Sequence, residues 1–491
     1  MPGVGGRLNA HAARVREGVA LSGADLDSRM SRSWRDAERA VFWLSRPGRP
    51  DSAPSLEGRT EADLAIVGGG FTGLWAAIQA KEDDPGRDVV LLEGSTIAFG
   101  GSGRNGGFCD QTLTHGLPNG LERFPRELEA IEGEARESFA GLAASVARYQ
   151  IECDWVDHGE LIVARQRHEL AWVDGAVTLL RRFGHDAEIL DREQTRAEVD
   201  SPTYLGSFWK RGGSAMVDPA RLAWGLARVA RTLGVRIHEG TEVTALGSDG
   251  AGVTLTTPGG RVRAGRVVLG TNAFPPLMRQ IRRYVLPVYD YVLVTEPLTG
   301  AERESVGWAE RQGIGDMGNR FHYYRTTDDG RILWGGYDAV YHWRGRVDLR
   351  FEDRPRTFDM LARHFYETFP QLVDVRFSHR WAGAIDTCSR FSVFFGTGLE
   401  GRLAYAAGYT GMGVGASRWG ARVALDLVDG RDTPRTRLDL VREKPLPFPP
   451  EPLRSVGVAL TVRALARADR HQGRRGPWLK VLDAVGLGFD S

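Results

Sequence analysis

Residues 63–82 read "DLAIVGGGFTGLWAAIQAKE", and this stretch decides the fold. Its first part, 63–67, is a short apolar run that is typical of a strand buried on both faces of a sheet. The run leads directly into "GGGFTG", which fits the pattern G-x-G-x-x-G, and an apolar helix-like segment follows. A strand, a glycine turn and a helix in this order indicate a Rossmann-like dinucleotide-binding unit.

Each glycine of this turn has a mechanical role. Gly68 permits the tight turn, Gly70 lets a pyrophosphate approach the backbone, and Gly73 lets the helix pack closely on the strand. The helix N-terminus supplies free N–H groups and partial positive charge. A second strand, "DVVLLE", ends at Glu93, whose carboxylate can accept hydrogen bonds from ribose hydroxyls. We therefore expect cofactor contacts from Gly68, Gly70, Phe71, Thr72, Gly73 and Glu93.

A glycine-dense loop, "FGGSGRNGGF" at residues 99–108, follows the second strand where a plain NAD dehydrogenase usually returns as a helix. Such a loop can lie flat against a ligand, although a flexible surface loop would have the same composition. Its serine and backbone N–H groups could bind phosphate, its arginine could neutralise that phosphate, and the segment 105–107 could line a planar ring. The expected contacts are Ser102, Gly103, Arg104, Asn105, Gly106 and Gly107.

The segments "GGGFTGLWAA", "VVLLE" and "GSGRNGG" together resemble the D-amino-acid-oxidase-type FAD-dependent oxidoreductases. Within that family the sequence is most similar to the branch that contains gamma-glutamylputrescine oxidase. The resemblance implies an α/β fold (α+β overall). The implied fold combines a Rossmann-like FAD-binding domain of glutathione-reductase type with an antiparallel-sheet substrate domain. It also implies non-covalent FAD, with the loop 99–108 passing beside the flavin ring.

Two remote segments support FAD. The segment 261–274 resembles the family's second FAD-contacting strand, and the segment just before it resembles the strand pair that flanks the adenine. Residues 402–430 give a strand, a second glycine turn and a long helix, whose N-terminal N–H groups can face the flavin's pyrimidine edge. A second turn of this kind favours FAD over NAD. The expected contacts are Val243, Thr271, Asn272, Gly408, Tyr409, Gly411, Met412 and Gly413.

The three FAD segments are dispersed, so we expect a discontinuous cofactor domain. The predicted division is an N-terminal extension over 1–60 with one helix (within 27–44) and a linker, a FAD-binding domain over 61–150, 215–285 and 385–435, a substrate domain over 151–214 and 286–384, and a C-terminal tail over 436–491 that packs on the body. In the substrate domain we expect a strand within 287–298, a hairpin over 320–341 that turns at Asp329-Gly330, and a helix that ends before Pro370.

The substrate site is less well marked. Alternating tyrosines, an arginine on a neighbouring strand, and the segment 379–390, which resembles the family segment beneath the ring, supply candidates. Other roles remain open for these residues. The tyrosines could pack in the core, Arg325 could form a structural ion pair, and Asp386 could cap a turn or a hairpin. The catalytic candidates are His115, Tyr289, Tyr291, Tyr324, Arg325, Trp381 and Asp386.

The resemblance implies oxidation of a C–N bond in a primary or secondary amine or amino acid to an imine, with O2 as acceptor and H2O2 as co-product. A dehydrogenase of the same fold that passes electrons to a quinone or carrier protein, and a flavoprotein without catalysis, remain alternatives. A general base is optional, because burial lowers the pKa of an ammonium group. The expected partners are thus a small amine or amino acid and O2 or an electron carrier.

Composition excludes several other classes. The 491 residues carry a net charge of +1, which gives no general field for nucleic acid or an anionic membrane. The three cysteines, Cys109, Cys153 and Cys388, form no CxxC pair, so we expect a reducing, cytoplasmic setting, no disulfide framework and no metal. No signal peptide or transmembrane segment is visible. The basic segment 454–470 could bind a membrane, but its weak apolar face favours docking on the protein itself.

Overall fold

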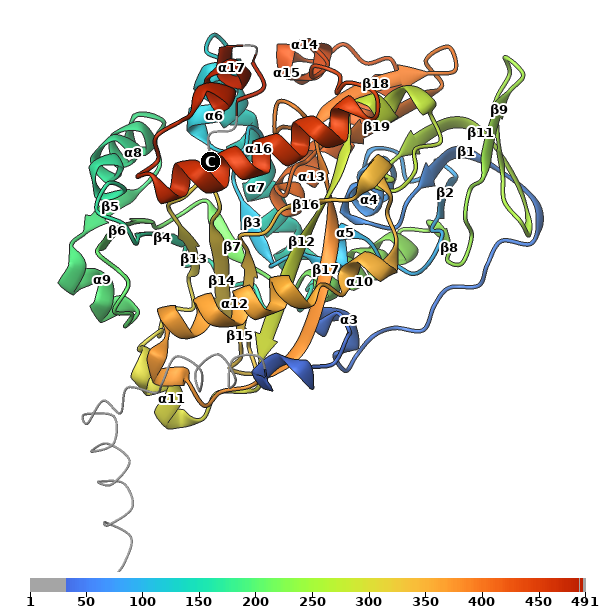
Figure 1. Cartoon of the computed structure of the whole chain (residues 1–491). Coiled ribbons are helices and arrows are strands. Elements are labelled where there is room, and N and C mark those ends of the chain that lie inside the picture. The colour runs from blue at the N-terminus through green and yellow to red at the C-terminus, as the bar shows by residue number, and fades with distance from the viewer. Residues whose placement is uncertain (1–31, 485, 489–491) are drawn as a thin grey trace, which may run out of the picture.

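The computed structural model describes residues 32–484 and 486–488, which form two large β-sheets and one two-stranded sheet, with helices packed against them (Figure 1). The fold class predicted from the sequence is confirmed, because a mainly parallel sheet and a mainly antiparallel sheet share one molecule. We propose that these two sheets mark the cofactor and substrate domains, with the bounds expected above.

The first sheet is the one that begins with the glycine motif. Its strand order is β18-β19-β11-β1-β2-β8, and the pairs from β19 to β8 are parallel. Leu64 and Ile66 of β1 face one hydrophobic core and Ala65 and Val67 face another, so the strand is buried on both sides. The strands are β1 (Gly58–Val67), β2 (Val89–Leu92), β8 (Arg236–His238), β9 (Ala245–Ser248), β10 (Val253–Thr256), β11 (Gly260–Leu269), β18 (Phe394–Gly398) and β19 (Leu403–Ala407).

Helices cover one face of this sheet. Helices α4 (Phe71–Asp83), α10 (Pro219–Thr232) and α13 (Gly413–Val428) share its largest core. On the outer side, α13 packs against α7 (Leu128–Arg148). Both α4 and α13 begin directly after a strand of the sheet, β1 and β19, and their N-termini therefore lie at the same edge, where the carboxyl ends of parallel strands meet.

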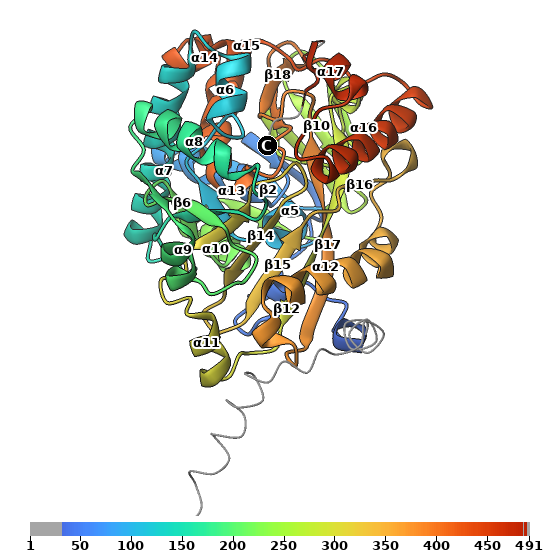
Figure 2. The same ribbon diagram turned by 60° about the vertical axis from the view of Figure 1, so that its left-hand side comes forward.

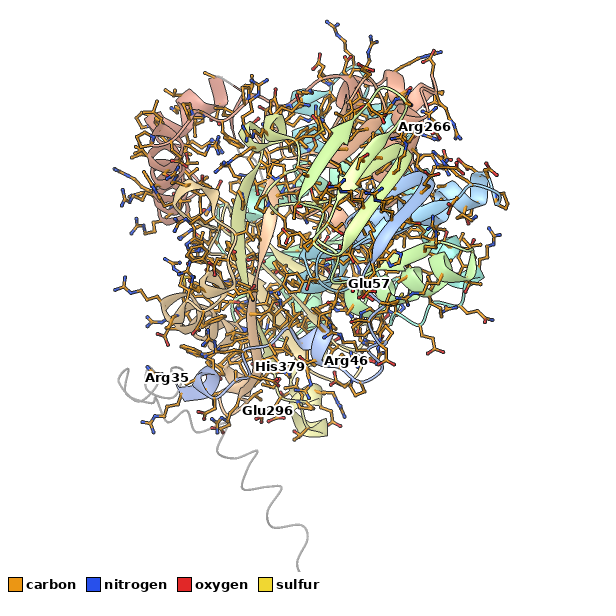
Figure 3. All side chains as sticks on the ribbon, turned by 90° about the vertical axis from the view of Figure 1, so that its right-hand side faces the viewer. Arg35, Arg46, Glu57, Arg266, Glu296 and His379 are labelled. Carbon is orange, nitrogen blue, oxygen red and sulfur yellow. The ribbon has the colours of Figure 1, made fainter. Side chains whose placement is uncertain are left out.

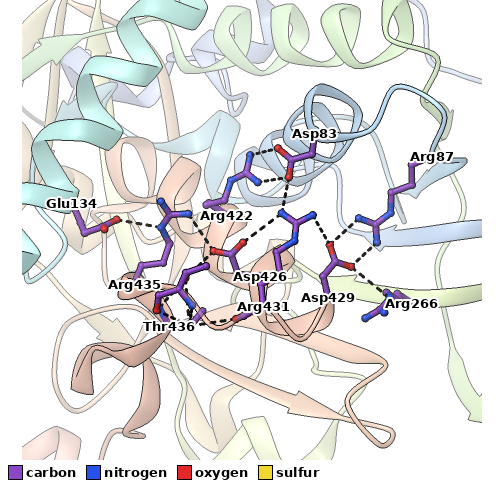
Figure 4. A network of polar contacts seen from close by, with 11 residues as sticks. Asp83, Arg87, Glu134, Arg266, Arg422, Asp426, Asp429, Arg431, Arg435 and Thr436 are labelled. Atoms are coloured by element: carbon purple, nitrogen blue, oxygen red, sulfur yellow. Dashed lines mark hydrogen bonds and ion pairs between the residues drawn. The ribbon is translucent and has the colours of Figure 1, made fainter.

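Ion pairs join the far ends of these helices (Figure 4). Asp83 at the end of α4 accepts from Arg422 and Arg431, and Asp429 at the end of α13 pairs with Arg87 and Arg431. Burial opposes the ionisation of Asp83, but the two guanidinium groups outweigh it and lower the pKa of this carboxyl. The network holds α4 and α13 side by side at the end opposite to their N-termini.

The second sheet has the order β16-β12-β15-β14-β13-β4-β6-β5, and β17 pairs with β12. All its strand pairs are antiparallel except the pair of β13 with β4, which is parallel. The sequence did not predict this parallel pair. Helix α12 (Pro355–Thr368) packs on it. The strands are β4 (Glu160–Ala164), β5 (Ala187–Leu190), β6 (Gly206–Lys210), β12 (Leu286–Thr295), β13 (Gly313–Asp316), β14 (His322–Thr326), β15 (Ile332–Gly336), β16 (Val340–Tyr341) and β17 (Phe377–Thr387).

Local predictions for the second sheet are confirmed. Strands β14 and β15 form the predicted antiparallel hairpin, and Gly330 in its turn has a φ of +77°, which favours glycine. Strand β12 lies within the predicted segment 287–298 except for its first residue, and α12 ends two residues before Pro370. The remaining elements are β3 (Phe108–Asp110), β7 (Ser214–Met216), α5 (Gly101–Arg104), α6 (Leu117–Arg123), α8 (Leu170–Arg182), α9 (Arg192–Glu198) and α11 (Gly300–Val306).

The single N-terminal helix expected within 27–44 is wrong over the described residues. Residues 32–35 are helical, 36–41 are not, and α3 (Phe42–Ser45) follows. The break arises because the backbone N–H of Glu38 donates to Ser378 O and its carbonyl accepts from Arg380, so this residue pairs with β17. Figure 3 labels His379 of β17 in this region. Residues 27–31 lie outside the described part of the chain.

The tail contains α14 (Pro434–Arg437), α15 (Asp439–Arg442), α16 (Leu453–Arg470) and α17 (Pro477–Ala484). Helix α16 crosses the molecule on the same side as α17 (Figures 1 and 2). Asp469 anchors its end by accepting from the Asn319 amide at 2.7 Å and from Arg320 at 3.2 Å. Among the described residues, no helix combines the length and the apolar character needed to cross a bilayer.

Candidate functional site

One cavity of about 1100 Å³ lies at the edge where α4 and α13 begin, and the second sheet supplies its opposite wall. Gly70, Arg104 and Gly413, which belong to three remote segments, all line it. Its volume is slightly above the usual range of ligand pockets, about 300 to 1,000 Å³. A ligand in this cavity can therefore contact all three segments at once.

The first glycine turn is built for close backbone approach. A Cβ atom on Gly73 would lie 1.9 Å from the carbonyl oxygen of Gly68, so no other residue fits there without a shift of the backbone. Gly68 has a φ of +109°, and a Cβ on it would lie 2.6 Å from Gly270 O. These contacts fix β1, β11 and α4 against each other and leave the α4 N-terminus open to the cavity.

Ser102 prepares that N-terminus for an anion. Its hydroxyl oxygen accepts from the Phe71 N–H at 2.9 Å, which leaves the hydroxyl proton free to donate. A Cβ on Gly70 would lie 2.8 Å from the same oxygen, so glycine keeps this space clear. The donor set of helix N–H groups and a hydroxyl fits a pyrophosphate.

Glu93 stands at the end of β2, where the sequence placed it. Its carboxylate accepts from the backbone N–H groups of Gly69 at 2.6 Å and Ser95 at 2.8 Å. Burial raises the pKa of Glu93, and these two hydrogen bonds oppose the rise. Glu93 lines the cavity together with Val243, which fits a ribose and an adenine at this end.

The structure corrects the expectation for Arg104. Its guanidinium group pairs with Glu352 at 2.6 Å and donates to Phe99 O and Ala382 O, so it holds the loop against β17 rather than neutralising a phosphate. Asn105 likewise ties the loop to itself, because its amide donates to Gly101 O and accepts from the Gly107 N–H at 2.8 Å. The loop is therefore a rigid wall of the cavity.

The second glycine turn precedes α13. The buried carboxylate of Asp386 accepts from the Gly408 N–H at 2.6 Å. The Tyr409 hydroxyl accepts from Thr72 at 2.9 Å, which joins the second turn to α4. Gly411 has a φ of +89° and, like Gly413, keeps the entrance to α13 open. The first N–H groups of α13 have no acceptors within the helix, and Gly413 and Val414 line the cavity, so these groups are available to an electron-rich ligand.

The structure brings most of the predicted cofactor residues to this one cavity. Four predicted glycines do not line it but lie behind its wall, where a Cβ would meet other atoms: Gly73, Gly103, Gly107 and Gly408. The others line the cavity: Gly68, Gly70, Phe71, Thr72, Glu93, Ser102, Arg104, Asn105, Gly106, Val243, Thr271, Asn272, Tyr409, Gly411, Met412 and Gly413.

Of the catalytic candidates, His115 and Asp386 line the cavity. Burial lowers the pKa of His115 to about 4, so its imidazole is neutral at pH 7. Burial raises the pKa of Asp386 to about 7, and the hydrogen bonds that its carboxylate accepts from backbone N–H groups oppose the rise. Asp386 thus holds the second glycine turn, which is the cap role left open above.

The structure does not bring the other candidates to the cavity. Tyr289 and Tyr291 share one face of β12, as predicted, but this face packs on the far side, where their hydroxyls donate to Asp348 O and Phe351 O. The remaining three have other buried partners. Tyr324 bonds Tyr204 and Asp316, Arg325 pairs with Asp154 at 3.2 Å, and Trp381 donates to Arg104 O.

The sequence reasoning missed Asp290, which lies between those two tyrosines and faces the cavity. Its carboxylate accepts from the Tyr323 hydroxyl, and burial raises its pKa to about 6. The strand alternation was the available signal, because a lone aspartate in an apolar strand must face a polar space. Asp110 and Glu160, two further carboxylates that line the cavity, were missed as well.

We expect the cofactor-free protein to lose stability as the pH rises from 6.5 to 8. Burial raises the pKa of Glu160 to about 8 and those of Glu169 and Asp386 to about 7. The folded state therefore binds more protons than the unfolded state in this range, and the free energy of unfolding falls. The buried histidines, such as His115 and His364 with pKa values of about 4, oppose the trend near and below pH 6.5, and their effect fades as the pH rises to 8. The urea midpoint of unfolding, measured at pH 6.5, 7.2 and 8, tests this prediction. A midpoint that rises with pH would contradict it.

Comparisons with known proteins agree with this geometry. Residues 63–427 match the family described as DAO, FAD dependent oxidoreductase. The chain is 30% identical over 384 residues to gamma-glutamylputrescine oxidoreductase of Escherichia coli, covering 75% of this chain and 84% of that one. It is 26% identical over 414 residues to the probable oxidoreductase OrdL of Haemophilus influenzae, covering 82% of this chain and 90% of that one.

Solved structures show the same fold. Glycine oxidase from Geobacillus kaustophilus superposes with a TM-score of 0.63 at 21% identity, covering 76% of this chain and 96% of that one. Iminodiacetate oxidase from Chelativorans sp. superposes with a TM-score of 0.60 at 16% identity, covering 77% and 99%. In these two comparisons, about a quarter of this chain has no counterpart in the neighbour.

Proposed function

Because this chain belongs to the DAO family of FAD-dependent oxidoreductases, we propose that it oxidises a C–N bond of a primary or secondary amine or amino acid to an imine. The observation that carries the proposal is one shared cavity. The segments that fit FAD and a polar wall of the second sheet, with Asp290 and Tyr323, border the same space. The E. coli relative, named gamma-glutamylputrescine oxidoreductase, supports an amine-type substrate.

The residues present fit FAD. We propose that the α4 N-terminus and Ser102 bind the pyrophosphate, Glu93 binds the ribose, and the α13 N-terminus binds the pyrimidine edge of the ring. Bound FAD supplies a two-electron acceptor. Cys388 lines the cavity, but its thiol donates to Ser392 O at 3.1 Å and burial raises its pKa, which disfavours a reactive thiolate. We therefore propose non-covalent FAD.

The protein's own task in this reaction is positioning. The amine must lose its ammonium proton before its C–H bond is oxidised. The carbon that bears nitrogen must present its C–H to the ring while water is limited. The products are a reduced cofactor and an imine, which water hydrolyses to a carbonyl compound and an amine or ammonia. We propose O2 as the electron acceptor, which gives H2O2.

An anaerobic titration of the FAD-loaded protein tests this proposal. We expect amines in a panel of primary amines, secondary amines and amino acids to bleach the visible flavin absorption, and admission of O2 to restore it with stoichiometric peroxide. A protein that binds no FAD, or a flavin that no member of the panel reduces, would refute the proposed function. Bleaching followed by reoxidation only with a dye would replace O2 by an electron carrier.

A further inference from the structure

A charged cluster borders the cavity next to α13, and nothing in the proposed reaction has used it. It consists of Glu160 at the start of β4, Asp110 at the end of β3 and Lys210 at the end of β6. Glu160 and Asp110 line the cavity itself. Glu160 and Lys210 are direct cross-strand partners, and the Lys210 Nζ lies 3.7 Å from an Asp110 carboxylate oxygen.

The cluster lies close to the place proposed for the flavin ring. The carbonyl oxygen of Asp110 packs on the first turn of α13, where a Cβ on Gly415 would lie 2.0 Å from it. Two residues earlier in β3, the ring of Phe108 packs edge-on against Tyr323, with ring centroids 5.6 Å apart. The same short strand therefore connects α13, the cluster and the Tyr323–Asp290 wall.

Glu160 differs from its neighbours in the polar contacts of its carboxyl group. Within the described residues, no hydrogen bond or ion pair joins its carboxyl group to another residue, whereas Asp110 accepts from Ser214 and pairs with Lys210. Burial among β4, β6 and β13, together with the charge of Asp110, raises the pKa of Glu160 to about 8, and Lys210 opposes the rise. Glu160 is half-buried, where a carboxylate without a partner is unfavourable, and a cation that enters the cavity would supply one.

The charges around the cavity favour a cation over a carboxylate. Two carboxylates and one ammonium group leave this cluster with a negative balance when Glu160 is ionised. Two of the three cavity-lining arginines have acidic partners: Arg104 pairs with Glu352, and Arg320 pairs with Asp469. The third, Arg454, belongs to α16 and donates to Pro449 O at 3.0 Å. His115, beside Asp110, is neutral at pH 7.

We propose that Glu160, with Asp110 beside it, binds the ammonium group of the substrate, and that this substrate is an amine without a carboxylate on the carbon that bears nitrogen. The inference rests on the proposed function and narrows its substrate class. A carboxylate on that carbon would come within a few bond lengths of Glu160 and Asp110, and like charges at such distances repel strongly in a buried site.

Three probes without a hydrogen on the carbon that bears nitrogen or oxygen test binding without oxidation. tert-Butylammonium carries the cation, tert-butanol is its neutral counterpart, and 2-aminoisobutyrate adds the carboxylate. Each is titrated into FAD-loaded wild type, Glu160→Gln and Glu169→Gln, and binding is read from the perturbation of the flavin absorption. Glu169 is the matched control: it is buried with a raised pKa, accepts from Arg165 and Gln166 N–H groups, and lies outside the cavity lining.

We expect Glu160→Gln to weaken tert-butylammonium binding about 30-fold or more at pH 8.5, since loss of one partner of a buried charge pair has effects of at least this size. The loss should shrink at pH 6, where wild-type Glu160 is protonated, and Glu169→Gln should bind as wild type. tert-Butanol should not distinguish the variants. In wild type, 2-aminoisobutyrate should bind at least about tenfold more weakly than tert-butylammonium.

Equal tert-butylammonium affinity in wild type and Glu160→Gln, or no binding to either, would overturn the proposal. So would 2-aminoisobutyrate binding as tightly as tert-butylammonium. Failure of the proposed function looks different, because a flavin that no amine bleaches leaves this Glu160-dependent binding intact. Conversely, oxidisable amines that bleach the flavin with the same apparent affinity in Glu160→Gln as in wild type would keep the function and remove the subsite.

Discussion

Replacing Gly73 by alanine is expected to abolish FAD binding and to destabilise the protein by roughly 3 kcal/mol, the upper end of the range for overpacked sites. The added Cβ would lie 1.9 Å from Gly68 O, and the contacted atom belongs to the backbone, which has no rotamer to change. Relief therefore requires α4 to move away from β1, and this movement takes the α4 N-terminus out of the cavity. Flavin content after purification and the urea midpoint measure the two effects.

Gly133→Ala is the matched control for that substitution. Gly133 lies within α7, is exposed, and has nothing within 4 Å of an added Cβ. Alanine should stabilise this helix by about 0.5–1 kcal/mol and leave FAD content unchanged. A Gly73→Ala protein that retains full flavin would contradict the role assigned to this turn.

Asp386→Ala is expected to destabilise the protein by about 3 kcal/mol and to lower its affinity for FAD at least tenfold. The carboxylate is buried, accepts from Gly408 N–H at 2.6 Å, and also faces the N–H groups of Tyr409 and Thr410. Each buried donor left unpaired costs about 1–3 kcal/mol. The turn that these donors belong to leads into α13, so its displacement also removes contacts to the cofactor.

Two further variants serve as an intermediate case and a surface control for Asp386→Ala. Asp386→Asn keeps one acceptor oxygen and should lie between wild type and Asp386→Ala in both measurements. Asp249→Ala removes an exposed carboxylate that pairs with Arg263 and accepts from the Ala251 and Gly252 N–H groups, and we expect a much smaller loss of stability from it. Denaturant titration and FAD equilibrium dialysis measure the effects. Asp386→Ala with wild-type stability would show that water or other groups satisfy the turn.

The parts of the site that follow from backbone chemistry were predictable from the sequence. A glycine turn after a buried strand permits few conformations. Gly68, Gly70 and the α4 N-terminus therefore lie at the cavity, as the sequence pattern predicted. The second turn before α13 has the same physical basis. These features are local, and short stretches of sequence encode them.

The parts that depend on tertiary contacts were not predictable. The alternation along β12 showed that Tyr289 and Tyr291 share a face, but only the packing of α12 and the segment 348–351 shows which face is interior. Arg104 looked free for phosphate, because its partner Glu352 is 248 residues away in the sequence. The N-terminal helix breaks at Glu38 because that residue pairs with His379 of β17, which lies even farther away along the chain.

The central claim is that three remote segments bind one FAD molecule. The most direct measurement is a crystal structure of the protein loaded with FAD. We expect one dinucleotide whose pyrophosphate contacts the Gly70–Phe71 backbone and Ser102, and whose ring lies between the loop 104–106 and the α13 N-terminus at Gly413. FAD bound elsewhere, or contacting only one of these segments, would contradict the claim.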